Sequence, residues 1–139
     1  MTVTDAWFQG RLTELTEAEC LELLATRQVG RLAYCDQDGP LAVPVNYVIH
    51  DGNVLFRTSP HTSLGQHAPS AAVAFEVDEI DDFTQSGWSV LVRGPAEYVD
   101  PDDLPTASDS RPVPWPQGVR TLHVRVRPLS ITGRRLLAG

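Results

Sequence analysis

The residues with the clearest chemical potential lie in the stretch VLFRTSPHTSLGQHA, residues 54–68. Arg57 and Thr58 end a predicted strand, and Thr62 and Ser63 begin a predicted short helix. An arginine fork, several hydroxyls and the free amides of a helix start are groups that bind phosphate. The chain nevertheless contains no lysine, because all 11 of its basic residues are arginine. The alternative is an ordinary turn, in which Arg57 is solvated and the hydroxyls only cap the helix.

Histidine and cysteine give weaker patterns. His61 and His67 are six residues apart, which places them on different faces of a helix, and no Cys, Asp or Glu completes a set at zinc spacing. No metal site is therefore predicted. Cys20 and Cys35 are expected to be buried, inert and reduced, since two cysteines do not make a disulfide framework.

The composition narrows the class of protein. A chain of 139 residues with 42% hydrophobic and 21% charged residues fits one globular domain, 1–139. Its net charge of -7 argues against a nucleic-acid or anionic-membrane partner, because both bind positive surfaces. The first residues lack a signal-peptide pattern, and no stretch is long enough to span a bilayer. These features indicate a soluble, cytoplasmic protein.

One amphipathic helix is predicted within residues 15–30. Thr16 and Glu19 have the spacing of a capping box, and the apolar residues that follow recur on one helical face. Gly30 is expected to end this helix or its connector.

The pattern then changes to strands, joined by signals for tight turns. Asp51-Gly52 favours a type I′ hairpin turn, and Pro44 indicates an edge position or a bulge. In the last strand, apolar and cationic residues alternate from 122 to 127, as in a half-buried strand. The predicted strands are 30–35, 40–50, 54–59, 71–78, 87–99 and 120–133.

Two segments fall outside this pattern. Residues 1–14 are interpreted as an N-terminal arm, and 100–118 as an acidic, proline-rich surface loop. The whole therefore predicts a mainly β fold, a six-stranded antiparallel β-barrel with Greek-key connections, an N-terminal helix and a short helix after strand three.

The ordered series GRLAYC, PLAVPVNYVI, VLFRTS, AAVAFEVD, GWSVLVRGPAEYV and ITGRR resembles the pyridoxamine 5'-phosphate oxidase-like family. It is most similar to the short members related to nitroimidazole reductases, over residues 15 to 135. The resemblance implies a split β-barrel, a homodimer, and FMN bound in grooves between the two subunits. A small molecule would then be the substrate.

The resemblance also implies a phosphate site in the stretch 54–68. Arg57 and Thr58 match the RT of the family motif, and Thr62 matches the T of the motif G-T-K-L. His61 stands where glycine is usual, and Ser63 stands where the phosphate-binding lysine is usual. Losing a charge-assisted contact costs about 1.5–3 kcal/mol, or roughly a tenfold to hundredfold loss in affinity. A protonated His61 at the mouth of the site would replace part of that charge.

The flavin ring would be contacted by residues from two other strands. Val45 and Asn46 fall where family members lie along the ring, and Trp88 and Ser89 fall where the partner subunit closes the groove. The alternatives are that Asn46 bonds across a bulge beside Pro44 and that Trp88 belongs to the core or the dimer interface. Near the C-terminus, the pair at 134–135 is either a cap on the groove or a frayed basic tail.

Two functions of different class follow. The favoured one is an FMN-dependent oxidoreductase, in which the flavin transfers electrons and the protein binds and orients it. The other is a non-enzymatic flavin-binding protein or a degenerate barrel without cofactor, which the changes at His61 and Ser63 support. Some relatives hold a deazaflavin or haem, and these cofactors stay open.

Overall fold

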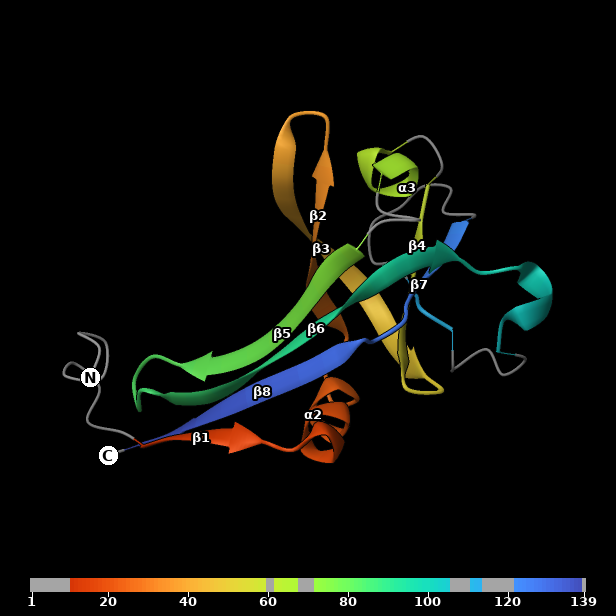
Figure 1. Ribbon diagram of the computed structural model, residues 1–139. Coiled ribbons are helices and arrows are strands. Elements are labelled where there is room, and N and C mark those ends of the chain that lie inside the picture. The colour runs from red at the N-terminus through yellow and green to blue at the C-terminus, as the bar shows by residue number, and fades with distance from the viewer. Residues whose placement is uncertain (1–10, 60–61, 68–71, 106–110, 114–121, 139) are drawn as a thin grey trace.

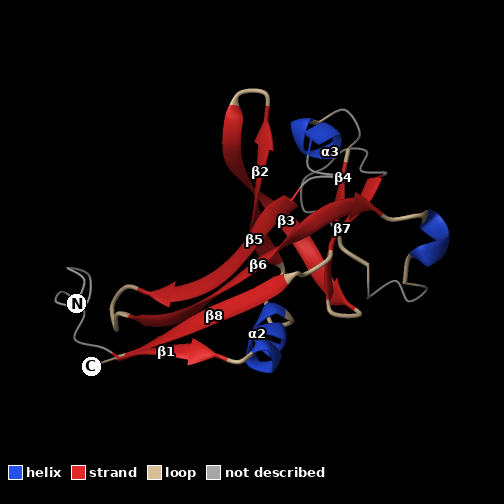
Figure 2. Ribbon diagram, in the orientation of Figure 1, coloured by secondary structure: helices blue, strands red, loops and turns tan. Residues whose placement is uncertain are grey.

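The computed structural model describes residues 11–59, 62–67, 72–105, 111–113 and 122–138 (Figure 1). Strands make up most of this part of the chain (Figure 2). The elements in chain order are β1 (Arg11–Leu15), α2 (Glu17–Leu24), β2 (Val29–Asp36), β3 (Gly39–His50), β4 (Asn53–Thr58), α3 (Ser63–His67), β5 (Ala72–Asp81), β6 (Ser86–Tyr98), the 3-10 helix η1 (Pro101–Asp103), β7 (Leu122–Val126) and β8 (Ser130–Leu137).

Six of these strands close into a barrel (Figure 1). They pair in the ring order β2-β3-β4-β7-β6-β5, and β5 pairs back with β2. Each pairing is antiparallel. Because the chain crosses from β4 to β5, β5 lies beside β2, which is a Greek-key arrangement. The predicted six-stranded antiparallel barrel, with its N-terminal helix and a short helix after the third barrel strand, is confirmed.

The long strand β6 joins the barrel to a two-strand extension. Its residues 96–98 pair with β7 in the barrel, whereas residues 87–93 pair with β8, and β1 pairs with the far side of β8. Between these regions, Gly94 lies so close to the β7–β8 connection that a Cβ would overlap the carbonyl oxygen of Arg127. A glycine is therefore required where the two parts of the sheet separate.

The extension corrects two predictions. Residues 11–14 of the predicted arm belong to strand β1, while residues 1–10 lie outside the described part of the chain. The single strand predicted over 120–133 is two strands, β7 and β8. Pro128 lies between them and has no amide hydrogen to continue the ladder, and the pairing partner changes there from β4 to the first half of β6.

Alternate residues of the strands fill the barrel interior. Phe56, Phe75 and Leu32 have no exposed surface, and Tyr47 packs edge-on against Phe75 with ring centroids 4.8 Å apart. Full burial of an aliphatic or aromatic side chain contributes roughly 1.5–3 kcal/mol. The Tyr47 hydroxyl donates a hydrogen bond to the carbonyl oxygen of Leu24, which ties the end of α2 to the barrel.

Helix α2 begins as the sequence predicts but ends earlier. The Thr16 hydroxyl accepts from the Glu19 amide at 3.2 Å, and the Glu19 carboxylate accepts from the Thr16 amide at 2.9 Å, so the capping box is confirmed. The expectation that Gly30 ends the helix or its connector is wrong. Gly30 lies in β2, opposite Val45, where a Cβ would overlap the ring of Phe75.

The turn and edge signals are confirmed, whereas one burial prediction is wrong. Asp51 and Gly52 have φ values of 52° and 76°, as a type I′ turn requires. Pro44 sits at an edge, because β3 pairs only with β2 up to residue 46 and with β4 from residue 47. Cys20 is buried, but Cys35 is exposed, since β5 covers only residues 31–33 of β2.

The described part of the segment 100–118 is mostly exposed, in agreement with a surface loop. It begins with η1, and Pro105 and Pro112 are buried, Pro105 beside Leu55 and Arg125 of the barrel. The loop therefore packs on the protein rather than extending from it. Residues 106–110 and 114–118 lie outside the described part of the chain.

Candidate functional site

The end of β4 and the start of α3 bring three of the predicted phosphate-site residues together. Arg57 is half-buried on the outer face of β4, while Thr58, next along the strand, points inward and is 3% exposed. The Thr58 hydroxyl lies 3.1 Å from the Thr62 hydroxyl. His61 lies outside the described residues, and Ser63 is the first residue of α3.

The Thr62 hydroxyl is already occupied by protein partners. It donates to the Ser59 carbonyl oxygen at 2.8 Å and accepts from the Gly65 amide at 3.1 Å. The hydrogen of Thr58 is then directed at the Thr62 oxygen. Both hydroxyl hydrogens therefore point at protein acceptors, and Arg57 is the described group of this segment best suited to grip an anion.

The ring-contact residues on β3 lie where this strand changes partners. Asn46 pairs with Val29 of β2, and the next residue, Tyr47, pairs with Phe56 of β4. The Val45 side chain points inward and is 8% exposed, whereas the Asn46 side chain is half-buried on the opposite face. No bulge occurs beside Pro44, because the β2–β3 register is unbroken from 29 to 36. Of this pair, only Asn46 has its side chain on the outer face of β3, and its amide nitrogen is buried there.

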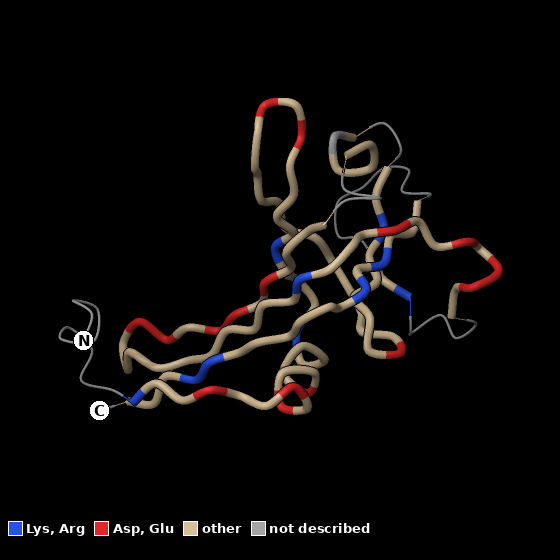
Figure 3. The backbone as a smooth tube through the Cα atoms, viewed as in Figure 1, with Lys and Arg blue, Asp and Glu red and all other residues tan. Residues whose placement is uncertain are grey.

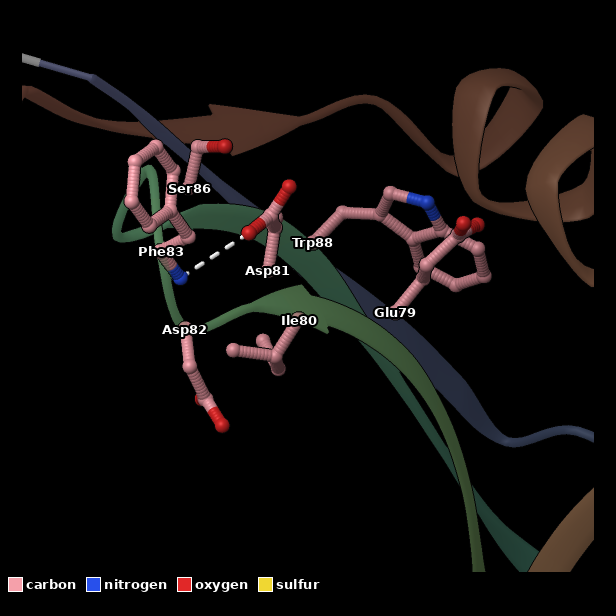
Figure 4. Close-up of a pocket in the computed structure, with 8 residues that line it drawn as sticks. Glu79, Ile80, Asp81, Asp82, Phe83, Ser86 and Trp88 are labelled. Carbon is pink, nitrogen blue, oxygen red and sulfur yellow. Dashed lines mark hydrogen bonds between the residues drawn. The ribbon is translucent and has the colours of Figure 1, made fainter.

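Trp88 and Ser89 lie on opposite faces of β6. Trp88 is 7% exposed and belongs to the hydrophobic core, which was the alternative left open by the sequence. Its ring lies near the Glu79 side chain, beside a 550 Å³ pocket at the β5–β6 hairpin (Figure 4). At the tip of that hairpin, the Phe83 amide donates to the Asp81 carboxylate at 2.9 Å. The pocket is lined by several carboxylates and is poorly suited to an anion.

Ser89 opens onto a different cleft, of about 410 Å³, formed by β1, β6 and β8. Arg93 and Arg134 contribute positive charge to its lining, and Leu91 and Ile131 contribute apolar surface. Arg134 lies opposite Ser89, and Arg135 lies opposite Trp88, in regular β8 pairing. The basic pair at 134–135 is therefore part of a strand and not a frayed tail.

Within one chain, the predicted phosphate-binding residue Arg57 lies far from Trp88 and Ser89, the residues predicted to close the groove. Arg57 lies in β4, which reaches β6 only through β7, at Ala96 and beyond. Along β6, the distance from Trp88 to Ala96 is about 26 Å at roughly 3.3 Å per residue. One copy of the chain therefore does not bring Arg57 and Ser89 to the same ligand.

A cluster of charged residues on β2 and β5 was missed by the sequence reasoning. An Arg31 guanidinium nitrogen lies 3.5 Å from a carboxylate oxygen of both Glu76 and Asp78. Burial, and after it the neighbouring Asp78, raise the pKa of Glu76 to about 7, although Arg31 opposes both effects. The signal in the sequence was the i, i+2 spacing of the two acids, which alternation places on one face of a strand.

Between pH 5 and pH 8, we expect the free energy of unfolding to fall by about 1 kcal/mol less in Glu76→Gln than in the wild type. Because the folded-state pKa is raised, the folded protein holds more protons than the unfolded chain between pH 4.5 and about 7. Stability is therefore lost as the pH rises through that range. The Glu76 side chain is 33% exposed, so solvent screening keeps the effect well below the full value of the shift.

Urea unfolding at both pH values measures this difference. Glu22→Gln, on the exposed face of α2, is the matched control and should follow the wild-type profile. Equal pH profiles for the wild type and Glu76→Gln would contradict the assignment.

The described residues show neither a metal-binding cluster nor a membrane-spanning helix. No group of three or more His, Cys, Asp or Glu side chains there is placed to hold a metal ion. No helix in that part of the chain is long and apolar enough to cross a membrane.

Comparison with known proteins agrees with this fold. The family model for pyridoxamine 5'-phosphate oxidase matches residues 16–135. The uncharacterized protein Rv0080 of Mycobacterium tuberculosis is 33% identical over 134 residues, covering 91% of this chain and 87% of that protein. A closed six-stranded barrel with a two-strand extension defines a split-barrel protein. This chain belongs to the pyridoxamine 5'-phosphate oxidase-like family.

Solved structures give the same result. The FAD binding protein from Mycobacterium smegmatis is 34% identical with a TM-score of 0.70, and the match covers 90% of this chain and 98% of that one. A putative pyridoxamine 5'-phosphate oxidase from Corynebacterium glutamicum is 32% identical with a TM-score of 0.77, covering 92% and 95% of the two chains.

Proposed function

We propose that this protein binds a flavin nucleotide, FMN in the first instance, and uses it as an oxidoreductase acting on a small molecule. The observation that carries the proposal is the half-buried Arg57 at the end of β4, in a chain whose residues 16–135 match the family model. The family membership and a 34% identical FAD-binding relative support a flavin. The cysteine usage favours a reducing, cytoplasmic setting.

The residues around Arg57 fit an anionic group. The pKa of the neighbouring His123 is lowered, first by burial and then by the charges of Arg57 and Arg111, so two guanidiniums act on this place in an acidic chain. The Arg57 fork would hold two phosphate oxygens at once. Thr58 and Thr62 would hold the β4–α3 turn in shape, and His61 and Ser63 would lie at the mouth of the site.

The bound flavin would supply electron transfer, and the protein would bind it, orient its ring and exclude water. Asn46 would contact the polar edge of the ring from outside the barrel, and the Val45 backbone would line its approach. No described side chain needs to act as a general acid or base.

A second copy of the chain would complete the site. Because Arg57 and Ser89 lie far apart in one chain, we propose a homodimer in which the 410 Å³ cleft beside Ser89 faces the partner's Asn46. The cleft offers two hydroxyls, two guanidiniums, one carboxylate and apolar surface, which suit a flavin ring with polar edges. Trp88 would support this strand from its other face.

Two observations favour a non-enzymatic flavin-binding protein or a degenerate barrel instead. The hydroxyl hydrogens of Thr58 and Thr62 are directed at protein acceptors, and Ser63 stands where the resemblance expects a lysine. Together these features leave fewer donors for a phosphate. FAD is the second candidate cofactor, because the M. smegmatis relative is described as an FAD binding protein.

The absorbance spectrum of the purified protein tests the proposal. We expect a flavin spectrum, or uptake of FMN or FAD at micromolar concentration in equilibrium dialysis, and bleaching by NAD(P)H or a reductase. A flavin that binds but is never reduced would favour the non-enzymatic protein. A colourless protein that takes up no flavin would be a degenerate barrel, and a deazaflavin or haem would reveal itself by its own spectrum.

A further inference from the structure

The antiparallel register places a histidine directly beside Arg57. Arg57 of β4 pairs with His123 of β7. The neighbours Phe56 and Val124 are fully buried inside the barrel, so the alternation puts Arg57 and His123 together on the outer face. Both side chains are half-buried. Cross-strand neighbours of this kind have Cβ atoms about 4.5–5.5 Å apart, close enough to contact one small ligand together.

The loop after β6 brings a third cation to this face. The Arg111 Nε donates to the Pro105 carbonyl oxygen at 2.6 Å, which fixes the guanidinium relative to the loop. Pro105 is buried and lines a small cleft with Leu55 and Arg125, the adjacent cross-strand pair on β4 and β7. The loop therefore folds back over the same outer face. Figure 3 shows arginines on this side of the barrel, with acidic residues at the end of β6 and in the loop after it, and further acidic residues along the β5–β6 hairpin.

Several charged groups surround this face. Arg125, two residues from His123 on β7, is held by Glu97 of β6 at 2.9 Å, and Arg127 lies 3.5 Å from the same carboxylate. Asp103 of η1 lines the cleft beside Arg125. The charges that act on His123 are those of Arg57 from β4 and Arg111 from the loop, and both lower its pKa. Two guanidiniums that act on one imidazole would also attract an anion placed beside it.

We propose that His123 and Arg111 form, together with Arg57, one anion subsite for the phosphate of the bound nucleotide, in place of the lysine that the chain lacks. The identity of the ligand rests on the proposed function, whereas the subsite itself rests on the β4–β7 register and the returning loop. The imidazole takes up a proton from solvent when the phosphate binds. The single phosphate of FMN and the diphosphate of FAD both present this chemistry.

Proton NMR titration of the four histidines tests the role of His123. The His123 signal is assigned by its loss in His123→Gln. We expect FMN to raise the pKa of His123 by about one unit, and riboflavin, which has no phosphate, to leave it unchanged. By linkage, a rise of one unit means that protonation of His123 strengthens FMN binding about tenfold.

Dissociation constants at pH 6.0 provide the second test. We expect Arg111→Gln and His123→Gln each to weaken FMN binding about three- to tenfold and to leave riboflavin binding unchanged. Arg125→Gln is the matched control, because Arg125 lies on the same face of β7 but is held by Glu97, and it should bind FMN like the wild type. Variants are compared at one pH, since the phosphate itself titrates near pH 6.

The outcomes separate this inference from the proposed function. If FMN binds and neither variant weakens it, or if the pKa of His123 does not respond to FMN, the subsite is wrong while flavin binding stands. If no flavin binds, inorganic phosphate or pyrophosphate replaces it as the probe. A phosphate-dependent rise in the pKa of His123 then supports an anion subsite without flavin, and no rise overturns the inference. Because Arg111 lies on an exposed loop, its variant tests the subsite even if His123→Gln does not fold.

Discussion

Replacing Arg57 by glutamine is expected to weaken FMN binding about tenfold to a hundredfold and to leave riboflavin binding within about twofold of the wild type. A charge-assisted bidentate contact contributes about 1.5–3 kcal/mol, and each 1.4 kcal/mol corresponds to about a factor of ten in affinity. Glutamine keeps the length of the stem and a hydrogen-bond donor but removes the charge and the fork. Fluorescence titration of each flavin into the purified variant measures the two affinities.

Arg127→Gln is the matched control for Arg57→Gln. Arg127 follows the alternating β7 residues, is exposed, and lies 3.5 Å from Glu97, so its loss should change neither flavin affinity. Unfolding curves for both variants exclude a general loss of structure. An equal loss of riboflavin and FMN binding in Arg57→Gln would show that Arg57 supports the fold or the ring and does not grip the phosphate.

Most of the barrel could be predicted because its signals are local. Thr16 and Glu19 mark the helix start because their spacing is that of a capping box. Asp51-Gly52 marks a hairpin because the turn needs two positive φ angles, which few residue pairs tolerate. Strand alternation separates inward from outward residues without knowledge of the partner strand. These features depend on neighbours within a few residues, and each of them is confirmed.

The missed features depend on partners distant in the sequence. The exposure of Cys35 is decided by how far β5 extends along β2. The split at Pro128 reflects a change of partner from β4 to β6, which alternation within one strand does not reveal. Gly30 looks like a helix end in the sequence, but position 30 requires a small residue because the ring of Phe75 packs against it.

The candidate site shows the same division. Arg57 and Thr62 were found because they lie close together in a recognisable stretch. His123 was seen only as a strand residue between arginines, since its place beside Arg57 follows from the register of two strands far apart in the chain. Strand alternation also divides the predicted pairs Val45–Asn46 and Trp88–Ser89, so only one side chain of each pair faces outward. Residue type therefore identified the chemistry, and long-range pairing decided which side chains can take part in it.

Restoring the absent cation by Ser63→Lys is expected to strengthen FMN binding about tenfold to a hundredfold, the reverse of the Arg57→Gln effect. Position 63 begins α3, directly after Thr62, and it is where the resemblance implies a phosphate-binding lysine. An ammonium group there would add a charge-assisted contact to the phosphate. Isothermal titration with FMN and with riboflavin separates a phosphate effect from a ring effect.

Ser63→Met is the matched control for this gain, because methionine has a long unbranched side chain without the charge. Only the lysine variant should bind FMN more tightly, and its advantage should shrink as salt is added, since added ions screen exposed charges. Combining Ser63→Lys with Arg57→Gln should return FMN affinity to near the wild-type level if both groups act on one phosphate. A lysine that strengthens neither FMN nor FAD binding would place the phosphate away from the start of α3, and the β4–α3 turn would then be a structural feature only.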